Sequence, residues 1–371
     1  MTNDQDVMAC LKSLPPVVVS HDLAPEILAR VRAEQRVRLT VRFCVYAVAS
    51  AAAALVLLLG GLWLFGAKST DPGRQAVAWL CRTQEPDGSW SAAKWGGNKQ
   101  FEVALTGLSL ITLLDGASGG NPAVERAIAY LIRQQQADGQ FGDRFSASPY
   151  NHGIATLALA KAYETRKNER LRLALDRAVA VICACQQADG GWGYQTEARS
   201  EANLSITLWQ IEALRHAAAQ GWTQARPNVE RGLRWMTDVA SDDGSFGYQR
   251  RGDTQVDASQ TLTAMGAMSL LDPVHAVLVS PGRRQAIKAQ MQRLAATPGP
   301  DMDYYRRYFL AAALKKMDEE SAHRGLAEIR HELVTRQIKH GTEVGSWKAD
   351  DRWSSSGGRI YATAMASLSL R

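Results

Sequence analysis

The sequence predicts an all-α protein in which one transmembrane helix precedes six tandem helical hairpins closed into a ring. Three observations lead to this prediction. A stretch of 25 uncharged residues is long enough to cross a lipid bilayer, an Asp-Gly-x-aromatic motif recurs at intervals near 51 residues, and each motif separates an amphipathic stretch from an apolar one. Alternating amphipathic and apolar helices are typical of two-layer α-helical folds.

The composition is that of a globular protein, with 46% hydrophobic and 22% charged residues and a net charge of +6 over 371 residues. No run of five or more basic residues occurs, which argues against nucleic acid as a partner. Five cysteines are present: Cys10, Cys44, Cys81, Cys183 and Cys185. On a helix, Cys183 and Cys185 would point about 200° apart, which suits neither a shared metal nor a disulfide. We therefore interpret the cysteines as small buried apolar residues.

Residues 43–67 carry no charged side chain. As a helix they would be about 37 Å long, against roughly 30 Å for the hydrocarbon core of a bilayer. Trp63 and Phe65 lie near the outer end, where interfacial aromatic residues occur. A signal peptide would have an apolar region about half as long and closer to the start. The segment therefore predicts a transmembrane helix that contacts the lipid bilayer.

The basic residues around this segment predict its orientation. Five arginines lie in the fifteen residues before it, and three basic residues lie in the fifteen after it. This excess favours a cytoplasmic N-terminus. The predicted domains are a cytoplasmic tail with a juxtamembrane helix at 1–42, the transmembrane helix at 43–67 and an exported repeat domain at 68–371.

The tail has one clear predicted element, a helix over 22–34 with an acidic start, an early proline at Pro25 and basic residues later. The stretch 14–36 is similar to the juxtamembrane part of bacterial membrane anti-sigma factors, a resemblance that implies a cytoplasmic protein partner of the tail. The His-x-x-x-Cys-x-x-Cys zinc motif of that family is absent, since Cys10 stands alone. The alternative is an amphipathic lead-in to the membrane helix.

The repeat is defined by the aromatic residue that ends each motif. These residues are Trp90, Phe141, Trp192, Phe246 and Trp347. The steps between them are 51, 51, 54 and 101 residues, and the last step equals about two periods. A degenerate unit is therefore expected near 296–303, which gives six units between about 72 and 371.

Each unit follows the same plan. An amphipathic stretch such as 124–132 leads into the Asp-Gly turn, where glycine takes the positive φ that ends helices. After a polar loop comes a helix rich in small residues and poor in charge, expected inside the domain, with the charged helices outside. The predicted inner helices are 103–114, 152–163, 203–216, 257–271, 304–317 and 360–370.

The pattern basic–small–x–x–aromatic–Leu, followed by Gln and Gly-x-aromatic, resembles the repeat of squalene and oxidosqualene cyclases. Prenyltransferase β-subunits have a looser version. The second unit carries it as Arg126-Ala127, Tyr130-Leu131, Gln135 and Gly139-Gln140-Phe141. The resemblance covers about 300 residues and implies an α/α toroid around an apolar cavity, with the glutamine and the aromatic residue joining neighbouring repeats. Six units is the number that closes such a ring.

Closure has a specific consequence for packing. The first unit must pack against the last, so the helix at 74–82 is expected to contact the helices around 325–336. The last inner helix, 360–370, is as apolar as the others and does not have the polar face of a capping unit.

In the resembling families, catalytic residues lie at the starts of the inner helices. We aligned these helices on Thr106, Thr156, Thr207, Thr261 and Thr363. The position four residues earlier then holds the candidate cavity-mouth residues Glu102, His152, Asn203, Asp257 and Arg359, and the degenerate unit offers Tyr304 or Tyr305. The alternative is that these residues are polar only because helix starts carry free backbone N–H groups.

Two chemistries of the resembling families are incomplete here. Cyclases use an Asp-x-Asp-Asp cluster, of which only the middle acid, Asp257, is present, as the candidate catalytic residue. An isolated carboxyl group ionises near pH 3.9 and is a poor proton donor to an alkene. Prenyltransferases bind zinc through Asp, Cys and His. Ser259 replaces the thiolate and Tyr305 or Arg306 the imidazole, so neither a metal nor a cofactor is expected.

The last two units, with the motifs around 303–309 and 345–364, resemble a membrane-anchored bacterial branch of undefined activity, which implies the fold and no reaction. The expected location is the bacterial cell membrane, with the repeat domain in the periplasm. Three functions stay open: binding of an apolar isoprenoid or lipid ligand or of a protein partner, a divergent terpene cyclase or prenyltransferase-like enzyme using Asp257, and an anti-sigma-like transmembrane signalling protein. Binding ranks above catalysis because both catalytic signatures are broken.

Overall fold

The computed structural model describes residues 71–116, 120–194, 201–253, 259–297 and 301–371, with a few positions between 8 and 33. Residues 43–67 and Asp257 lie outside the described residues. None of the helices that the structure describes has the length and apolar character needed to cross a membrane. The chain divides into two units, Met1–Lys68 and Ser69–Arg371. Of the predicted tail helix, the described positions are helical: Pro25, Ala29, Arg30, Arg32 and Ala33.

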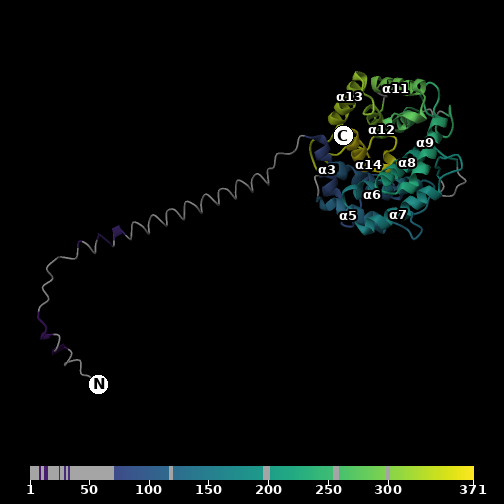
Figure 1. The fold of residues 1–371 in the computed structure, drawn as a ribbon. Coiled ribbons are helices and arrows are strands. Elements are labelled where there is room, and N and C mark those ends of the chain that lie inside the picture. The colour runs from purple at the N-terminus through teal and green to yellow at the C-terminus, as the bar shows by residue number, and fades with distance from the viewer. Residues whose placement is uncertain are drawn as a thin grey trace. The chain divides into compact units, whose positions relative to one another are not determined.

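The described helices of Ser69–Arg371 alternate between an outer and an inner layer (Figure 1). The outer helices are α3 (Pro72–Thr83), α5 (Pro122–Arg133), α7 (Glu169–Ala184), α9 (Arg226–Val239), α11 (Pro281–Ala296) and α13 (Glu320–Arg336). The inner helices are α4 (Glu102–Gly116), α6 (Ser148–Thr165), α8 (Leu204–Ala219), α10 (Ser259–Leu270), α12 (Tyr304–Leu314) and α14 (Ser354–Ser369). The described residues contain only isolated β-bridges and no strand, so they are mostly helical as predicted.

Helices α6 and α14 begin several residues earlier than the sequence predicted. Helix α6 starts at Ser148, because Pro149 at the first turn is compatible with a helix start. Helix α14 starts at Ser354 and is kinked at Gly358, which has a φ of 59° and a ψ of −160°. The degenerate fifth connection is located as expected, between the end of α11 and the start of α12.

The outer helices begin with residues that satisfy free backbone N–H groups. The side chains of Asp71, Asn121 and Asn168 accept hydrogen bonds from backbone groups in the first turns of α3, α5 and α7. Proline occupies an early position in α3, α5 and α11. The inner helices differ, since nearly every residue of α4 from Val103 to Leu113 is buried. This burial explains why their sequence has no polar face.

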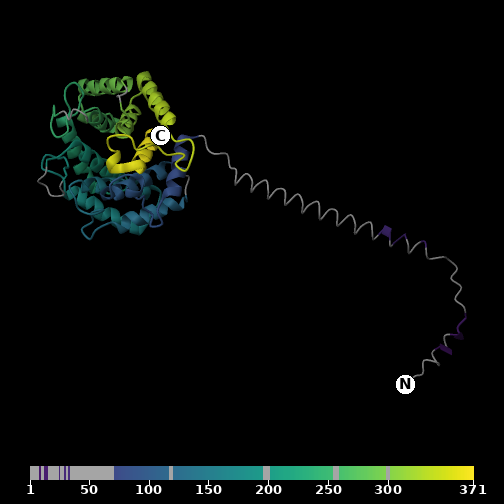
Figure 2. The same cartoon turned by 180° about the vertical axis from the view of Figure 1, so that it is seen from behind.

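Each inner helix packs against inner helices on both sides. The contacts run from α4 to α6, α8, α10, α12 and α14 in order, and α14 also contacts α4. The last hairpin therefore lies against the first, and the yellow C-terminal segments lie beside the blue α3 in Figure 2. The prediction paired α3 with α13 across this junction. In the structure, α3 contacts α14 and residues that follow α13, and the Gln337 side chain donates to the backbone carbonyl of Pro72 at the start of α3.

The repeated glutamine joins consecutive units. Its Nε2 donates to the backbone carbonyl of a residue in the first two turns of the next outer helix, as in Gln84 to Ala123 at 2.9 Å. The same bond occurs from Gln135 to Ala174, from Gln186 to Asn228 and, between the last unit and the first, from Gln337 to Pro72. The Gln84 side chain donates both to a backbone carbonyl of its own turn and to one of the next outer helix. These two bonds together fix the spacing of neighbouring units.

The turn glycine allows the units to approach closely. Gly88 has a φ of 95°, and a Cβ there would lie 2.2 Å from the carbonyl oxygen of Arg126 in the next unit. Gly345 has a φ of 93°, and a Cβ there would lie 2.4 Å from the carbonyl oxygen of Gln75 in the first unit. Both positions therefore need glycine for backbone conformation and for space.

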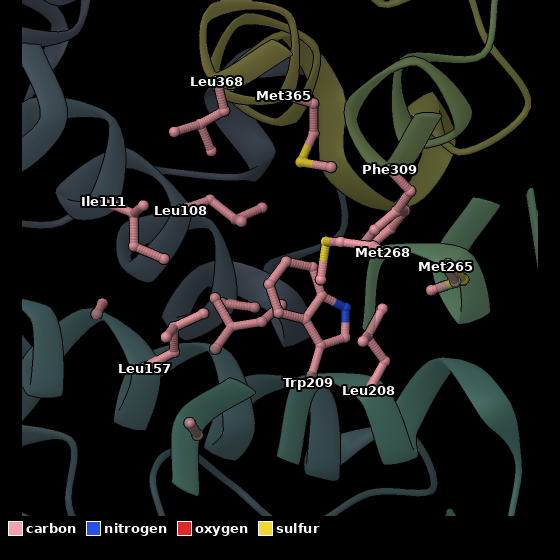
Figure 3. Close-up of a cluster of buried hydrophobic side chains, with 14 of the residues drawn as sticks. Leu108, Ile111, Leu157, Leu208, Trp209, Met265, Met268, Phe309, Met365 and Leu368 are labelled. Carbon is pink, nitrogen blue, oxygen red and sulfur yellow. The ribbon is translucent and has the colours of Figure 1, made fainter. Parts of the chain in front are cut away.

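The repeated aromatic residue joins the two helices of its own hairpin. Trp90, Trp192 and Trp347 are buried, and each indole N–H donates to a carbonyl near the end of the outer helix. The interior beyond these residues is filled by apolar side chains from all six inner helices, which point toward one another in Figure 3. The labelled residues there are Leu108, Ile111, Leu157, Leu208, Trp209, Met265, Met268, Phe309, Met365 and Leu368.

Candidate functional site

A cavity of about 550 Å³ lies among the N-terminal ends of the inner helices. All six contribute to its wall, through Ala104, Tyr150, Ser205, Thr261, Tyr305 and Tyr361. Leu108 and Met265 belong both to this wall and to the apolar cluster of Figure 3, so the cavity ends where that cluster begins. The seventeen lining residues that the structure describes include no charged side chain.

One part of the wall is aromatic. The Tyr305 ring lies 5.9 Å from that of Trp353 and 6.5 Å from that of Tyr361, measured between ring centroids. Tyr150 and Tyr194 are 6.4 Å apart in an edge-to-face arrangement. Such rings offer large apolar faces and a few polar tips, a combination suited to small-molecule pockets.

Four lining hydroxyl groups lie in two short hydrogen-bonded pairs. The hydroxyl oxygens of Tyr150 and Ser205 are 2.6 Å apart, and those of Tyr194 and Tyr248 are also 2.6 Å apart. The Ser205 hydroxyl donates to Oδ1 of Asn203 at 2.9 Å. Burial raises the pKa of Tyr150 and of Tyr248 above the usual value, so both phenols stay protonated at neutral pH.

Other hydroxyl groups of the wall bond protein groups outside it. The Tyr361 hydroxyl donates to Oδ2 of Asp351 at 2.9 Å, and the Thr261 hydroxyl donates to Oδ2 of Asp303 at 3.2 Å. The Tyr305 oxygen accepts a hydrogen bond from the indole N–H of Trp209. Burial also raises the pKa of the Asp351 carboxyl group.

Glu102 and Arg359 do not line the cavity. The Glu102 carboxylate accepts from the backbone N–H of Ala92 at 3.2 Å and from the Tyr130 hydroxyl at 3.3 Å, within its own hairpin and the next outer helix. Arg359 pairs with Glu343 at 2.8 Å, on the turn of its own hairpin. Both side chains therefore hold loops in place on the side of the helix away from the cavity.

His152 and Asn203 also bond the backbone. Nδ1 of His152 accepts from the Phe141 N–H at 3.1 Å, and its Nε2 lies 3.1 Å from the carbonyl oxygen of Ala178, to which it donates. Burial lowers the pKa of His152 to about 4, so the ring is neutral at neutral pH. Asn203 precedes α8 and its side chain accepts from the Ile206 N–H. Among the described candidates, only Tyr305 lines the cavity, and Asp257 is not described.

The alignment of the fourth inner helix differs in the structure. The backbone N–H groups of Trp90, Trp192 and Trp347 donate to Thr106, Thr207 and Thr363, as the alignment implied. In the fourth unit, however, Phe246 donates to Thr263 and not to Thr261, which lines the cavity. Four residues before Thr263 stands Ser259. The connection between Phe246 and its inner helix is longer in this unit, so the threonine that accepts the bond lies two residues later than the one aligned from the sequence. The period of the repeat alone did not show this difference.

The cavity wall is formed by a different helix position from the predicted one, which was four residues before the reference threonine. The residues two before each reference threonine are Ala104, Ile154, Ser205, Thr261 and Tyr361, and all of them line the cavity. Residues two positions apart on a helix point about 200° apart, so the positions four before the reference face the hairpin turn instead. In the part of the chain that the structure describes, no three His, Cys, Asp or Glu side chains are grouped so as to hold a metal.

Four wall residues were not predicted from the sequence: Tyr150, Tyr194, Tyr248 and Trp353. One signal for two of them was available. Tyr194 and Tyr248 each follow the repeated aromatic residue of their unit by two positions, after a glycine. No other unit has a tyrosine at this place.

Part of the chain is similar in sequence to known proteins. Residues 46–152 and 102–208 match the squalene-hopene cyclase C-terminal domain family. The domain is terpene cyclase-like. Drimenyl diphosphate synthase from Streptomyces showdoensis is 30% identical over 49% of this chain and 34% of its own length. Ent-copalyl diphosphate synthase from Streptomyces sp. (strain KO-3988) is 35% identical over 36% of this chain and 25% of its own length. The chain thus spans about a quarter to a third of these relatives.

Solved structures of a terpene cyclase and of a glycosidase share this fold. A variant of the type II terpene cyclase MstE from Scytonema, in complex with merosterolic acid A, has a TM-score of 0.53 and 16% identity over 81% of this chain and 95% of its own. The alpha-1,6-mannanase from Salegentibacter sp. HEL1_6 has a TM-score of 0.61 at 9% identity over 81% and 99%. At these identities the similarity concerns the fold alone.

Proposed function

We propose that this protein is a membrane-anchored terpene cyclase-like protein that binds an apolar isoprenoid or lipid in its central cavity. The observation that carries the proposal is the 550 Å³ cavity with an uncharged wall among the described residues. Cavities of roughly 300–1,000 Å³ with apolar walls and few polar groups are typical of small-molecule sites. The relatives named as diphosphate synthases of terpene type support an isoprenoid over other apolar molecules.

The scaffold in this proposal is an α/α toroid of six hairpins that holds the cavity at its centre. The contact of α14 with α4 and the bond from Gln337 to Pro72 support closure. Closure matters for binding because a continuous ring of inner helices supplies a wall on every side of the ligand.

The membrane anchor in this proposal is the segment 43–67, with residues 1–42 in the cytoplasm and the repeat domain in the periplasm. The uncharged sequence of the segment and the excess of arginine before it support this topology. Reporter fusions after Lys68 test it. Periplasmic reporter activity is expected, and cytoplasmic activity would reverse the orientation.

Binding without turnover is favoured over catalysis. Asp257 lacks the neighbouring acids of the cyclase cluster, and His152, Glu102 and Arg359 serve structural contacts. The second candidate function is a divergent cyclase that uses Asp257. Incubation with squalene and with geranylgeranyl diphosphate separates the two, because a cyclised product that disappears with Asp257→Asn would establish an enzyme.

A third candidate is an anti-sigma-like signalling protein, in which the toroid senses a ligand outside and the tail contacts a cytoplasmic protein. The tail sequence at 14–36 is the observation that favours it. Co-purification with and without residues 1–42 tests this role. A cytoplasmic protein that is lost with the tail would support it.

The direct test of ligand binding is solvent extraction of the purified full-length chain, followed by mass spectrometry. Ala147 lines the cavity and is only half-buried, so Ala147→Trp should fill the cavity without disrupting the core. Ala219→Trp is the control, because Ala219 is exposed at the last position of α8. An isoprenoid or lipid should accompany the wild type and Ala219→Trp and be depleted from Ala147→Trp. Equal recovery from all three would refute binding in this cavity.

A further inference from the structure

We propose that the cavity recognises an oxygenated isoprenoid, an uncharged terpenoid with an alcohol or carbonyl oxygen, through the hydroxyl groups of Tyr150, Tyr194, Ser205 and Tyr248. These four residues are called the hydroxyl cluster. The inference rests on the proposed function and specifies the ligand of that site. All four residues line the cavity, and they come from α6, α8 and the loops that follow α7 and α9.

The hydroxyl cluster differs from two other hydroxyl groups in the wall, those of Thr261 and Tyr361. Thr261 and Tyr361 each donate to a carboxylate, so their protons are already bonded to strong acceptors. The hydroxyl cluster contains no carboxylate, and its members bond mainly one another. Bonds between neutral hydroxyl groups are weaker and can be exchanged for bonds to a ligand.

The direction of the hydrogen bonds shows what the cluster offers a ligand. Asn203 Oδ1 accepts from the Ile206 N–H and from the Ser205 hydroxyl. The Ser205 proton is therefore used, and Tyr150 donates in the bond between Tyr150 and Ser205. The Tyr150 oxygen keeps its lone pairs as acceptors on the cavity wall.

The second pair adds a proton that can be redirected. One phenol of the Tyr194 and Tyr248 pair donates to the other, and the accepting phenol still holds its own proton. That proton can turn toward a ligand oxygen in the cavity, because both phenols belong to the wall. The cluster can thus donate one hydrogen bond and accept others. An alcohol or a carbonyl oxygen can use these groups.

The rest of the cavity wall is mainly apolar and requires that the remainder of the ligand be hydrocarbon. Leu108, Ile154, Leu262 and Met265 present apolar wall to the ligand. A ligand oxygen placed against them would lose its hydrogen bonds to water without gaining any from the protein. The oxygen is therefore directed to the hydroxyl cluster and the hydrocarbon chain to the apolar wall.

The test compares two probes of equal carbon skeleton, geranylgeraniol and the corresponding hydrocarbon without the hydroxyl group. Binding to the purified full-length chain is followed by quenching of tryptophan fluorescence, since Trp353 lies in the wall. We expect the alcohol to bind at least about tenfold more tightly, the equivalent of one net hydrogen bond of about 1.4 kcal/mol.

Tyr150→Phe and Tyr248→Phe remove one hydroxyl group each and keep the ring. Both should reduce the preference for the alcohol and leave the affinity for the hydrocarbon unchanged, which also shows that the variants are folded. Tyr163→Phe is the matched control, because Tyr163 lies near the far end of α6 against Trp222 and outside the cavity wall. It should bind both probes as the wild type does.

The outcomes separate this inference from the proposed function. Equal affinity of the wild type for both probes would overturn recognition of oxygen and leave the apolar cavity intact. Failure of both probes to bind would overturn the proposed function itself. An alcohol preference that survives in Tyr150→Phe and in Tyr248→Phe would place the polar contact elsewhere and also refute the inference.

Discussion

Replacing Gly345 by alanine tests whether the last and the first hairpins pack as tightly as neighbours within the chain. Gly345 has a φ of 93°, and an added Cβ would lie 2.4 Å from the carbonyl oxygen of Gln75. The left-handed conformation costs a non-glycine residue roughly 1–2 kcal/mol. Displacing the backbone of α3 adds about 1–3 kcal/mol, the usual cost of overpacking. Gly345→Ala should therefore lower the free energy of unfolding by about 2–5 kcal/mol.

Two matched variants isolate the contact between the units. Gly341 has a φ of 82° in the same loop, and no heavy atom lies within 4 Å of an added Cβ. Gly341→Ala should therefore lose only the free energy of placing alanine in the left-handed conformation. Gly88→Ala makes the equivalent clash at an internal junction, 2.2 Å from the carbonyl oxygen of Arg126, and should resemble Gly345→Ala. Urea unfolding of the full-length chain in mild detergent, followed by circular dichroism, measures the three. Equal losses for Gly345→Ala and Gly341→Ala would show that the two ends do not pack together.

Deleting residues 322–371 removes α14 and most of α13, so α4 and α12 each lose a neighbouring inner helix; cooperative urea unfolding should disappear, and a soluble, cooperatively folded monomer would contradict a closed ring. Burial lowers the pKa of His152 to about 4, below the unfolded value near 6.5, so the unfolded chain binds more protons between these pH values. Stability should fall by about 3 kcal/mol as the pH drops through this window, and His152→Gln should remove that dependence in urea titrations at pH 7, 6, 5 and 4. Elemental analysis should find no stoichiometric zinc, because Ser259 and Tyr305 replace thiolate and imidazole; one zinc per chain, lost with Asp257→Asn, would refute this.

The hairpins could be predicted from the sequence because their signals are local. A glycine at the turn, a glutamine before it and an aromatic residue after it recur with a nearly constant period. In the structure, Gln84, Gly88 and Trp90 make bonds within their own hairpin or to the start of the next helix. These short-range contacts are similar from unit to unit, so the residues that make them recur along the chain and can be recognised in the sequence.

The candidate site was less predictable because it depends on helix rotation. The position four residues before each reference threonine lies at the start of its inner helix, near the mouth expected for such a ring. Glu102 and Arg359 at that position nevertheless point to the hairpin turn, and Ala104 and Tyr361 two residues later point to the cavity. A shift of two residues turns a side chain to the opposite face of a helix, and no local signal distinguishes the two faces when both are buried.

The sequence by itself determined that this chain has six repeating helical hairpins and which helices lie inside, because period and polarity are properties of neighbouring residues. Only the tertiary structure decided which side chains form the cavity wall. Tyr150, Ser205 and Tyr248 belong to three different units, and they meet because α6, α8 and the loop after α9 are placed side by side by packing. Contacts between residues about 50 positions apart depend on helix rotation and on the fit of neighbouring units, which the order of residues along the chain does not display.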